Sequence, residues 1–289
     1  MRILVTGCRG LLGTDLMQRL DQNDTVKGVD IDDFDISDLN SALSYILDYR
    51  PDIILNCAAY TNADGCESDI ETSYKVNALG PRNLAIACNE IDAALLHIST
   101  DYIFDGIKGS AYKEDDTPNP LNIYGKTKLA GEEYLRSMCN KYYIVRTQWL
   151  FGKHGKNFVK TMLTLAKERN ELRVVNDQIG SPTYTPDLAA AITELIKTKA
   201  YGTYHVTNSG TVSWFEFTNE ILKVAGICGV KVIPITTEEL NRPALRPKYA
   251  PLDNFNWRIN GYSPLRSYKE ALKDYLNDYI TAERGMKLA

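Results

Sequence analysis

The chain has 289 residues, 44% of them hydrophobic and 24% charged, which suits a globular protein with one large α/β domain or two smaller ones. A formal net charge of −4 does not favour binding to the phosphate backbone of nucleic acids. No apolar run approaches the length of a membrane span, and the N-terminal MRILVTG lacks the pattern of a signal peptide.

The cysteines form no CxxC pair and no metal-like cluster with histidine, and several lie in apolar runs such as LNCAAY. We therefore expect reduced core thiols in a cytoplasmic protein, without nucleic-acid or membrane partners. The six cysteines are Cys8, Cys57, Cys66, Cys88, Cys139 and Cys228.

In the first half of the chain, short apolar runs alternate with helical patterns of ten or more residues. This alternation predicts βαβ units in a Rossmann fold, a doubly wound parallel sheet with helices on both faces. The predicted strands cover residues 2–6, 25–30, 52–59, 93–99 and 142–147. Predicted helices follow the glycine-rich turn after Gly7, cover 37–50 with Ser37 as N-cap and about 71–90, and begin again near Tyr124.

After about residue 150 the pattern loosens, and seven prolines between 182 and 264 break the chain into loops. We expect helices at 155–168, 185–197, 217–226 and 268–279 and a strand at 171–175. We divide the chain into a dinucleotide-binding domain at 1–150, joined by parts of 185–210, and a smaller substrate-binding lobe at 151–289. A cleft between them is where a small substrate would bind.

Three glycines, Gly7, Gly10 and Gly13, directly follow the first predicted strand and open a helix. Glycines at this spacing allow a tight turn and a close approach of the backbone to a pyrophosphate, which the helix N-terminus then attracts. The spacing alone is a weak signal, because a purely structural turn looks the same. Its place between a strand and a helix favours a dinucleotide site.

Two residues near this turn point to different cofactors. Asp30 ends the second strand, where an acid binds the adenosine ribose and disfavours a 2′-phosphate, as in NADH. Arg9 lies inside the glycine turn, where a guanidinium could bind that phosphate in NADPH. Both cofactors therefore stay open.

The third strand ends in small residues at 56–61, including Ala58. These residues would let a cofactor lie across the sheet, although a tightly packed strand end would look the same.

Tyr124 and Lys128 lie four positions apart, on one face of a predicted helix. A nearby ammonium favours the phenolate and lowers the tyrosine's pKa, so the pair can serve acid–base chemistry. The fourth strand ends in Ser99 to Tyr102, and Thr100 there could hydrogen-bond a substrate carbonyl. The Tyr-Lys pair alone is common on exposed helices, and a threonine alone often caps a strand. Together these features predict an active site.

These residues together resemble the extended short-chain dehydrogenase/reductase family and, within it, the dTDP-4-dehydrorhamnose reductase family. The resemblance covers roughly residues 1–190, with a weaker similarity at LRPKYAPLD. It implies reduction of the 4-keto group of dTDP-4-dehydro-L-rhamnose to dTDP-L-rhamnose by NADH or NADPH. It rests on the runs RPDIILNCAAYTNAD, STDYIFDG, LNIYGKTKLAGE, RTQWLFG, KNFVKTMLTLAKE and NDQIGSPTYTPDLA.

The resemblance also implies roles for single residues. The family's catalytic residues correspond to Thr100, Tyr124 and Lys128, and its helix asparagine, which supports the lysine through water in related enzymes, corresponds to Asn77. With Arg9, Gly13 and Ala58 from the motifs above, the cofactor-binding set is Gly7, Arg9, Gly10, Leu11, Leu12, Gly13, Asp30, Asp35, Ile36, Ala58, Ala59, Tyr60, Thr61, Asn77, Tyr124 and Lys128. The substrate-binding set is Thr100, Asp101, Tyr102, Trp149, Asn157 and Arg246.

One departure concerns oligomerisation. Some members of the reductase family carry glutamates that bind a metal at a dimer interface, and the corresponding residues here are the shorter Asp15 and Asp187. We therefore expect no bound metal, and a monomer or a homodimer.

Three alternatives stay open. A sugar-nucleotide dehydratase would carry a glutamate after its Thr-Asp pair, where this chain has Tyr102. An epimerase or another sugar-nucleotide reductase would share the same tyrosine. A non-catalytic subunit, such as the related regulatory subunit of methionine adenosyltransferase, would bind the dinucleotide without needing Thr100, Tyr124, Lys128 and Trp149 together.

Overall fold

The computed structural model describes residues 1–20 and 24–286. Its centre is a six-stranded sheet in the order β10-β5-β4-β3-β1-β2, and every neighbouring pair is parallel. The chain therefore crosses from β2 on one side of β1 to β3 on the other, which makes a topological switch point at β1. The strands are β1 (Arg2–Thr6), β2 (Thr25–Val29), β3 (Ile53–Asn56), β4 (Ala94–Thr100), β5 (Tyr142–Thr147) and β10 (Gly202–His205).

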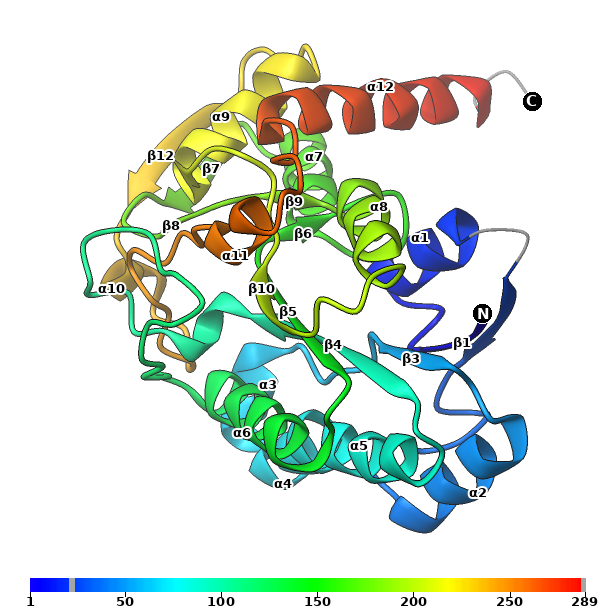
Figure 1. Ribbon diagram of the computed structural model, residues 1–289. Helices are drawn as coiled ribbons and strands as arrows, with labels where there is room; N and C mark the ends of the chain where they lie inside the picture. The colour runs from blue at the N-terminus through cyan, green and yellow to red at the C-terminus, as the bar shows by residue number, and fades with distance from the viewer. Residues whose placement is uncertain (21–23, 287–289) are drawn as a thin grey trace.

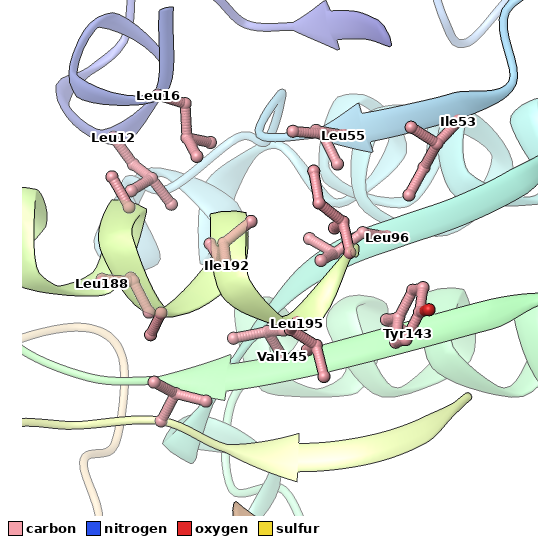
Figure 2. Packing of buried hydrophobic residues seen from close by; sticks show 14 of the residues in the cluster. Leu12, Leu16, Ile53, Leu55, Leu96, Tyr143, Val145, Leu188, Ile192 and Leu195 are labelled. Atoms are coloured by element: carbon pink, nitrogen blue, oxygen red, sulfur yellow. The ribbon is translucent and has the colours of Figure 1, made fainter. Parts of the chain in front are cut away.

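Helices cover both faces of this sheet, so the prediction of a doubly wound Rossmann fold is confirmed (Figure 1). Alternate strand residues point to opposite faces and build two separate cores. On one face, Leu12 and Leu16 meet Leu188 and Ile192 over the strands (Figure 2). That face carries α1 (Leu11–Arg19) and α8 (Thr185–Leu195), and the other carries α2 (Leu39–Tyr49), α5 (Gly80–Glu90) and α6 (Ile123–Met138).

Some predicted boundaries differ from the structure. The N-cap of α2 is Asp38 and not Ser37, because the Asp38 carboxylate accepts the Ser41 N–H at 2.7 Å. The predicted helix at 71–90 is three segments, α4 (Ile70–Tyr74), a π-helical turn η1 (Lys75–Leu79) and α5. β3 ends at Asn56, before the small residues 57–59. Those residues therefore leave the sheet and are free to line a cavity.

A second layer of elements lies beyond the carboxyl ends of the strands (Figure 1). Here α7 (Phe158–Glu168), α9 (Trp214–Val224) and α12 (Tyr268–Met286) share a core with β7 (Glu171–Val175). β7 pairs in parallel with β12 (Lys231–Ile235), a strand that we did not predict because Pro234 lies within it. A proline is tolerated in a strand that is paired on one side only.

Short elements complete both layers and the loops between them. They are α3 (Ala63–Ser68), the 3₁₀ turn η2 (Asp101–Ile103), β6 (Leu150–Phe151), β8 (Ile179–Gly180), β9 (Thr183–Tyr184), β11 (Val212–Ser213), α10 (Thr237–Leu240) and α11 (Phe255–Ile259).

All six cysteines are free thiols. The prediction that they are core thiols is wrong for Cys228, which is exposed, while Cys8 and Cys57 are half-buried. None of the helices in the described part of the chain is both long and apolar enough to cross a membrane.

Candidate active site

Two adjoining cavities, of about 410 and 470 Å³, open at the carboxyl ends of β1, β3 and β4. They share the lining residues Gly7, Gly10, Cys57 and Ala59, so they form one continuous groove across the switch point. Ligands of open parallel sheets bind at this place. We call the 410 Å³ part, beside β2, the adenosine cavity, and the 470 Å³ part, beside β4 and α6, the catalytic cavity.

The glycine turn lies where the two cavities meet. Gly7 has φ +65°, and a Cβ there would lie 2.8 Å from the Ala58 nitrogen, so only glycine fits. Helix α1 begins after Gly10 with no side-chain cap. The free N–H groups of its first turn, from Leu11 to Gly13, therefore face the groove, and an anionic diphosphate fits them.

In the adenosine cavity, Arg9 is held by acidic residues. Its side chain lies 2.6 Å from Asp32 and 3.5 Å from Asp30, and Asp30 also accepts the Arg9 N–H at 3.2 Å. Burial raises the pKa of Asp30, but hydrogen bonds from the Ile31 and Arg9 amides and from the Arg9 guanidinium lower it below its usual value. Asp35 and Ile36 also line this cavity.

Asn77 lies on the π-helical turn and contacts the backbone of Tyr60. Its amide accepts the Tyr60 N–H at 2.9 Å and donates to the Tyr60 carbonyl at 3.0 Å. Asn77 therefore fixes the segment whose neighbours Ala59 and Thr61 line the catalytic cavity. The side chain that reaches Lys128 directly is His97, at 3.0 Å, which the sequence analysis did not single out.

Tyr124, Lys128 and Thr100 all line the catalytic cavity. Helix α6 carries the first two, and Asn122 caps it by accepting the Gly125 N–H at 2.7 Å. A Cβ at Gly125 would overlap the Tyr102 carbonyl oxygen, so glycine lets α6 lie against η2, the turn that directly follows β4. Through that contact the local sequence brings Tyr124 beside the strand-end Thr100.

Burial raises the pKa of Tyr124 above its usual value, while a hydrogen bond with Thr100 opposes this and the Asp101 charge adds to it. The expectation that Lys128 lowers this pKa is therefore not met in this structure. The reason is that Lys128 points elsewhere: its amine donates to the Ile98 carbonyl at 2.6 Å and lies beside His97. Tyr124 is consequently a protonated phenol at neutral pH, which suits a proton donor.

Two other buried groups titrate near neutral pH. Burial lowers the pKa of Lys128 to about 8, with the Glu132 charge opposing it. Burial raises the pKa of Asp101 to about 7, against hydrogen bonds from Thr100 and the backbone. Both side chains are almost inaccessible to solvent, which accounts for the size of these shifts.

Trp149 forms one wall of the catalytic cavity. It has φ +50°, a conformation that costs a non-glycine residue energy and is often found at functional sites. Its indole stacks on Trp214, with ring centroids 3.5 Å apart and planes at 10°. Trp149 is partly exposed and lines the cavity, and it also packs against the core of the second layer.

The remaining predicted substrate residues lie differently. Asp101 and Tyr102 line the catalytic cavity, and Tyr102 packs edge-on against Tyr124 at 5.5 Å between centroids. Asn157 instead caps α7 and donates to the Gly152 carbonyl. Arg246 forms an ion pair with Asp64 at 3.0 Å. Neither Asn157 nor Arg246 is among the residues that line the two cavities.

Other residues also line the catalytic cavity and were not predicted, among them Gln148, Lys156 and Trp214. Only Trp214 had a local signal, because Ser213 and Glu216 form a capping box that starts α9 at this residue. The capping box predicts a helix start but not its contact with Trp149, which comes from a segment 65 positions earlier in the chain.

Asp15 and Asp187 are held by separate groups. Asp15 accepts the Thr185 hydroxyl and lies 3.5 Å from His154. Asp187 binds Asn208 at 2.8 Å and Arg266 at 2.9 Å. Within residues 1–20 and 24–286, no three His, Cys, Asp or Glu side chains gather as a metal site would require.

The model of one protein family, the RmlD substrate binding domain, matches residues 1–281. The chain is 41% identical over 282 residues to the spore coat polysaccharide biosynthesis protein SpsK of Bacillus subtilis, covering 97% of this chain and 99% of SpsK. It is 40% identical to a dTDP-4-dehydrorhamnose reductase of Streptomyces griseus, covering 94% and 92% of the two chains. The crystal structure of dTDP-4-dehydrorhamnose reductase from Bacillus anthracis in complex with NADP superposes with a TM-score of 0.94 at 44% identity, covering 96% and 99%.

The parallel sheet, the glycine turn at its switch point and the threonine, tyrosine and lysine around one cavity define a short-chain dehydrogenase/reductase of the extended type. Within that class, the chain belongs to the RmlD substrate binding domain family, the family of the dTDP-4-dehydrorhamnose reductases.

Proposed function

We propose that this protein is an NADH- or NADPH-dependent ketoreductase that converts dTDP-4-dehydro-L-rhamnose to dTDP-L-rhamnose by reducing its 4-keto group. The observation that carries the proposal is the continuous groove, with the uncapped N-terminus of α1 in the middle and Thr100, Tyr124, Lys128 and Trp149 at one end. The groove has room for a dinucleotide along it and a sugar at its catalytic end.

The free N–H groups at the start of α1 would hold the cofactor diphosphate, and Asp30 would bind the adenosine ribose. Held by these residues, the reduced cofactor would supply the hydride for the reduction. Asp35 and Ile36 would contact the adenine, and the backbone at Ala58, Ala59 and Tyr60 would lie along the cofactor. Lys128, on the floor of the catalytic cavity, would bind the nicotinamide ribose.

Tyr124 would donate its phenolic proton to the C4 oxygen as the hydride adds to C4. Its raised pKa keeps the proton in place at neutral pH until the developing alkoxide takes it. Thr100 would donate a hydrogen bond to the same oxygen. Thr100 lines the cavity, and its hydroxyl, which now donates to Asp101 at 3.1 Å and accepts the Tyr102 N–H at 3.2 Å, would turn its proton to the substrate.

The sugar would lie against Trp149, and we assign sugar-nucleotide binding mainly to the lobe at 151–289. The exposed Lys156 lies at the cavity wall and offers a positive charge for a diphosphate. We assign cofactor binding to residues 1–150, together with α8, which packs on the same sheet, and β10, which is one of its strands.

The test is a product assay with a dTDP-4-keto-6-deoxy sugar, run with NADH and NADPH separately. We expect oxidation of the nicotinamide together with formation of the 4-hydroxy sugar nucleotide. Tightly bound, non-exchangeable NAD in the purified protein would favour an epimerase. Absence of turnover with every keto-sugar nucleotide, combined with co-purification of a protein partner, would favour a non-catalytic subunit.

A further inference from the structure

A line of buried polar side chains runs from the catalytic cavity into the sheet. The Lys128 amine lies 3.0 Å from His97 Nε2, and His97 Nδ1 lies 3.0 Å from Asn56 Nδ2. Asn56 Oδ1 in turn accepts the Thr6 hydroxyl at 2.7 Å. All four residues are at most 1% exposed. The line joins three neighbouring strands, since Asn56 on β3 pairs with both Thr6 on β1 and His97 on β4.

The backbone fixes the orientation of the Asn56 amide. The Ala58 N–H lies 3.2 Å from Asn56 Oδ1, and a backbone N–H can only donate, so the atom facing it must be oxygen. The Asn56 NH₂ group therefore faces His97. Because that group can only donate, His97 Nδ1 must be an unprotonated acceptor.

The tautomer of His97 follows from this contact. Burial and the neighbouring Lys128 lower the pKa of His97 well below its usual value, so the ring is neutral. A neutral imidazole with a bare Nδ1 carries its proton on Nε2. This N–H points at the Lys128 nitrogen, which can accept it only as a neutral amine. The amine can still donate to the Ile98 carbonyl, so every contact is satisfied.

We propose that His97, oriented by Asn56, is a positioning residue for the reduction: it holds the Lys128 amine below the cavity and opposes the uptake of a proton by that amine. This inference rests on the proposed function, because it concerns the lysine of that site. An ammonium in the same place would face the Nε2–H, donor against donor.

The charges around Lys128 are consistent with an amine that takes up a proton less readily than usual. On its own helix Glu132 opposes the loss of a proton, but Glu132 is paired with Arg146 of β5 at 2.8 Å. After β3, burial raises the pKa of Cys57 to about 12, so that thiol is neutral at working pH. Tyr124, on the same helix, is also neutral. His97, on β4, contributes a neutral donor.

The arrangement has a consequence for turnover. When Tyr124 gives its proton to the sugar oxygen, the phenolate must regain one, and a protonated Lys128, which lines the same cavity, can supply it once its amine turns from the Ile98 carbonyl toward the phenol. The lysine is then a neutral amine, the state that His97 Nε2–H stabilises, until it takes up a proton from solvent. Asn56 and Thr6 hold no titratable proton. The line of buried side chains therefore sets the protonation state of Lys128 but does not conduct protons.

The first test reads the tautomer directly. The chain has three histidines, so imidazole ¹⁵N NMR of the whole protein resolves each ring. We expect His97 to carry its proton on Nε2. His205 is a matched internal reference of the opposite tautomer, because its Nδ1 faces the Tyr112 carbonyl at 2.9 Å and its Nε2 faces Arg146 at 3.2 Å. A wild-type His97 protonated on Nδ1 would overturn the proposal.

The second test inverts the tautomer. Asn56→Asp keeps the shape and still accepts from Thr6 and Ala58, but presents an oxygen to His97 Nδ1. We expect the His97 proton to move to Nδ1, the His205 signals to stay, and the alkaline limb of kcat/KM for the sugar nucleotide to rise from near pH 8 by about one pH unit or more. His97→Gln, which adds no charge and can turn its oxygen to an ammonium, should move the limb the same way.

A merely structural role would lower kcat/KM equally at all pH values and leave the limb in place, and that result would contradict the proposal. If Asn56→Asp does not fold, the tautomer of His97 in the wild type and the pH profile of His97→Gln still test the proposal. The outcomes also separate the two proposals. An Nε2–H tautomer in a protein that reduces no keto sugar would count against the proposed function, and an Nδ1–H tautomer in an active reductase only against this inference.

Discussion

The two ends of the groove hold their charges in different ways. At the adenosine end, the side chains of Arg9 and Asp32 are 61% and 74% exposed and pair with each other in contact with water. At the catalytic end, Asp101 and Lys128 are 4% and 1% exposed, and burial moves both pKa values toward neutrality. Exposed pairs of this kind contribute little energy, whereas desolvation shifts proton affinities strongly. We therefore expect the selectivity between NADH and NADPH to depend on the exposed adenosine end and the proton transfer to depend on the buried catalytic end.

The largest effect is expected when the proposed proton donor at the catalytic end is removed. Tyr124→Phe keeps the ring but loses the phenol, so we expect kcat to fall about 10²–10⁴-fold, the usual range for a general acid. Cofactor affinity, measured by NADH fluorescence, should change little. Tyr134→Phe is the matched control, because Tyr134 lies on the same helix and its hydroxyl binds Tyr74 at 3.0 Å. Equal rates for the two variants would refute the role of Tyr124.

A second prediction concerns stability and pH. The folded pKa of Asp101, about 7, lies above its unfolded value, so the folded state keeps this proton longer. The contribution of Asp101 to stability should therefore fall as pH rises from about 4 to 7, and Asp101→Asn should remove this contribution, which is a few kcal/mol in order of magnitude. Thermal unfolding across that range measures it.

Asp105 provides the control of opposite sign. Burial raises the pKa of Asp105, but hydrogen bonds from Tyr112 and Asn119 lower it below its usual value overall. Its contribution to stability is present above the unfolded pKa and is lost as pH falls through the folded one. Asp105→Asn should therefore weaken the protein at neutral pH and leave the fall between pH 4 and 7. The same slope in Asp101→Asn and in the wild type would exclude desolvation of Asp101 as its cause.

A third prediction concerns the wall of the catalytic cavity. Trp149→Ala removes the indole proposed to contact the sugar, and we expect KM for the sugar nucleotide to rise about tenfold, or ~1.4 kcal/mol. Affinity for NADH or NADPH should be unchanged, since Trp149 lines the catalytic and not the adenosine cavity. Trp149→Phe keeps an aromatic face and should lose less. A parallel loss of cofactor and sugar affinity would indicate a packing role.

The smallest effect is expected from a substitution at the exposed adenosine end of the groove. Asp32→Ala frees Arg9 from its 2.6 Å contact and lets the guanidinium meet a 2′-phosphate. The preference for NADPH over NADH, measured as a ratio of kcat/KM values, should rise a few-fold, because an exposed pair is worth at most about 1 kcal/mol. Asp92→Ala, which removes a similarly exposed acid paired with Lys141, is the control. A ratio that Asp32→Ala does not move would mean that Arg9 does not reach the 2′-phosphate position.

Much of the fold was predictable because each element follows from a local pattern. The run RILVT forms β1, the glycine turn leads into α1, and the pair Tyr124 and Lys128 begins α6 as expected. Boundaries were less predictable where two local options compete, as at Ser37 and Asp38, which differ by one residue. The π-helical turn at Asn77 also has no clear signal in the sequence, because it arises where the helix packs against α6.

The sequence by itself determined the dinucleotide turn, the order of strands and helices, and which side chains stand at the strand ends. These depend on backbone geometry and on periods of two or 3.6 residues, which neighbouring residues encode. Only the tertiary structure decided where Lys128 points, which tautomer of His97 meets it, and that Trp214 backs Trp149. Those contacts join segments that are far apart in the chain. The proton affinities of Lys128 and His97 depend on the register of β3 against β4 and on the exclusion of water from the buried side chains.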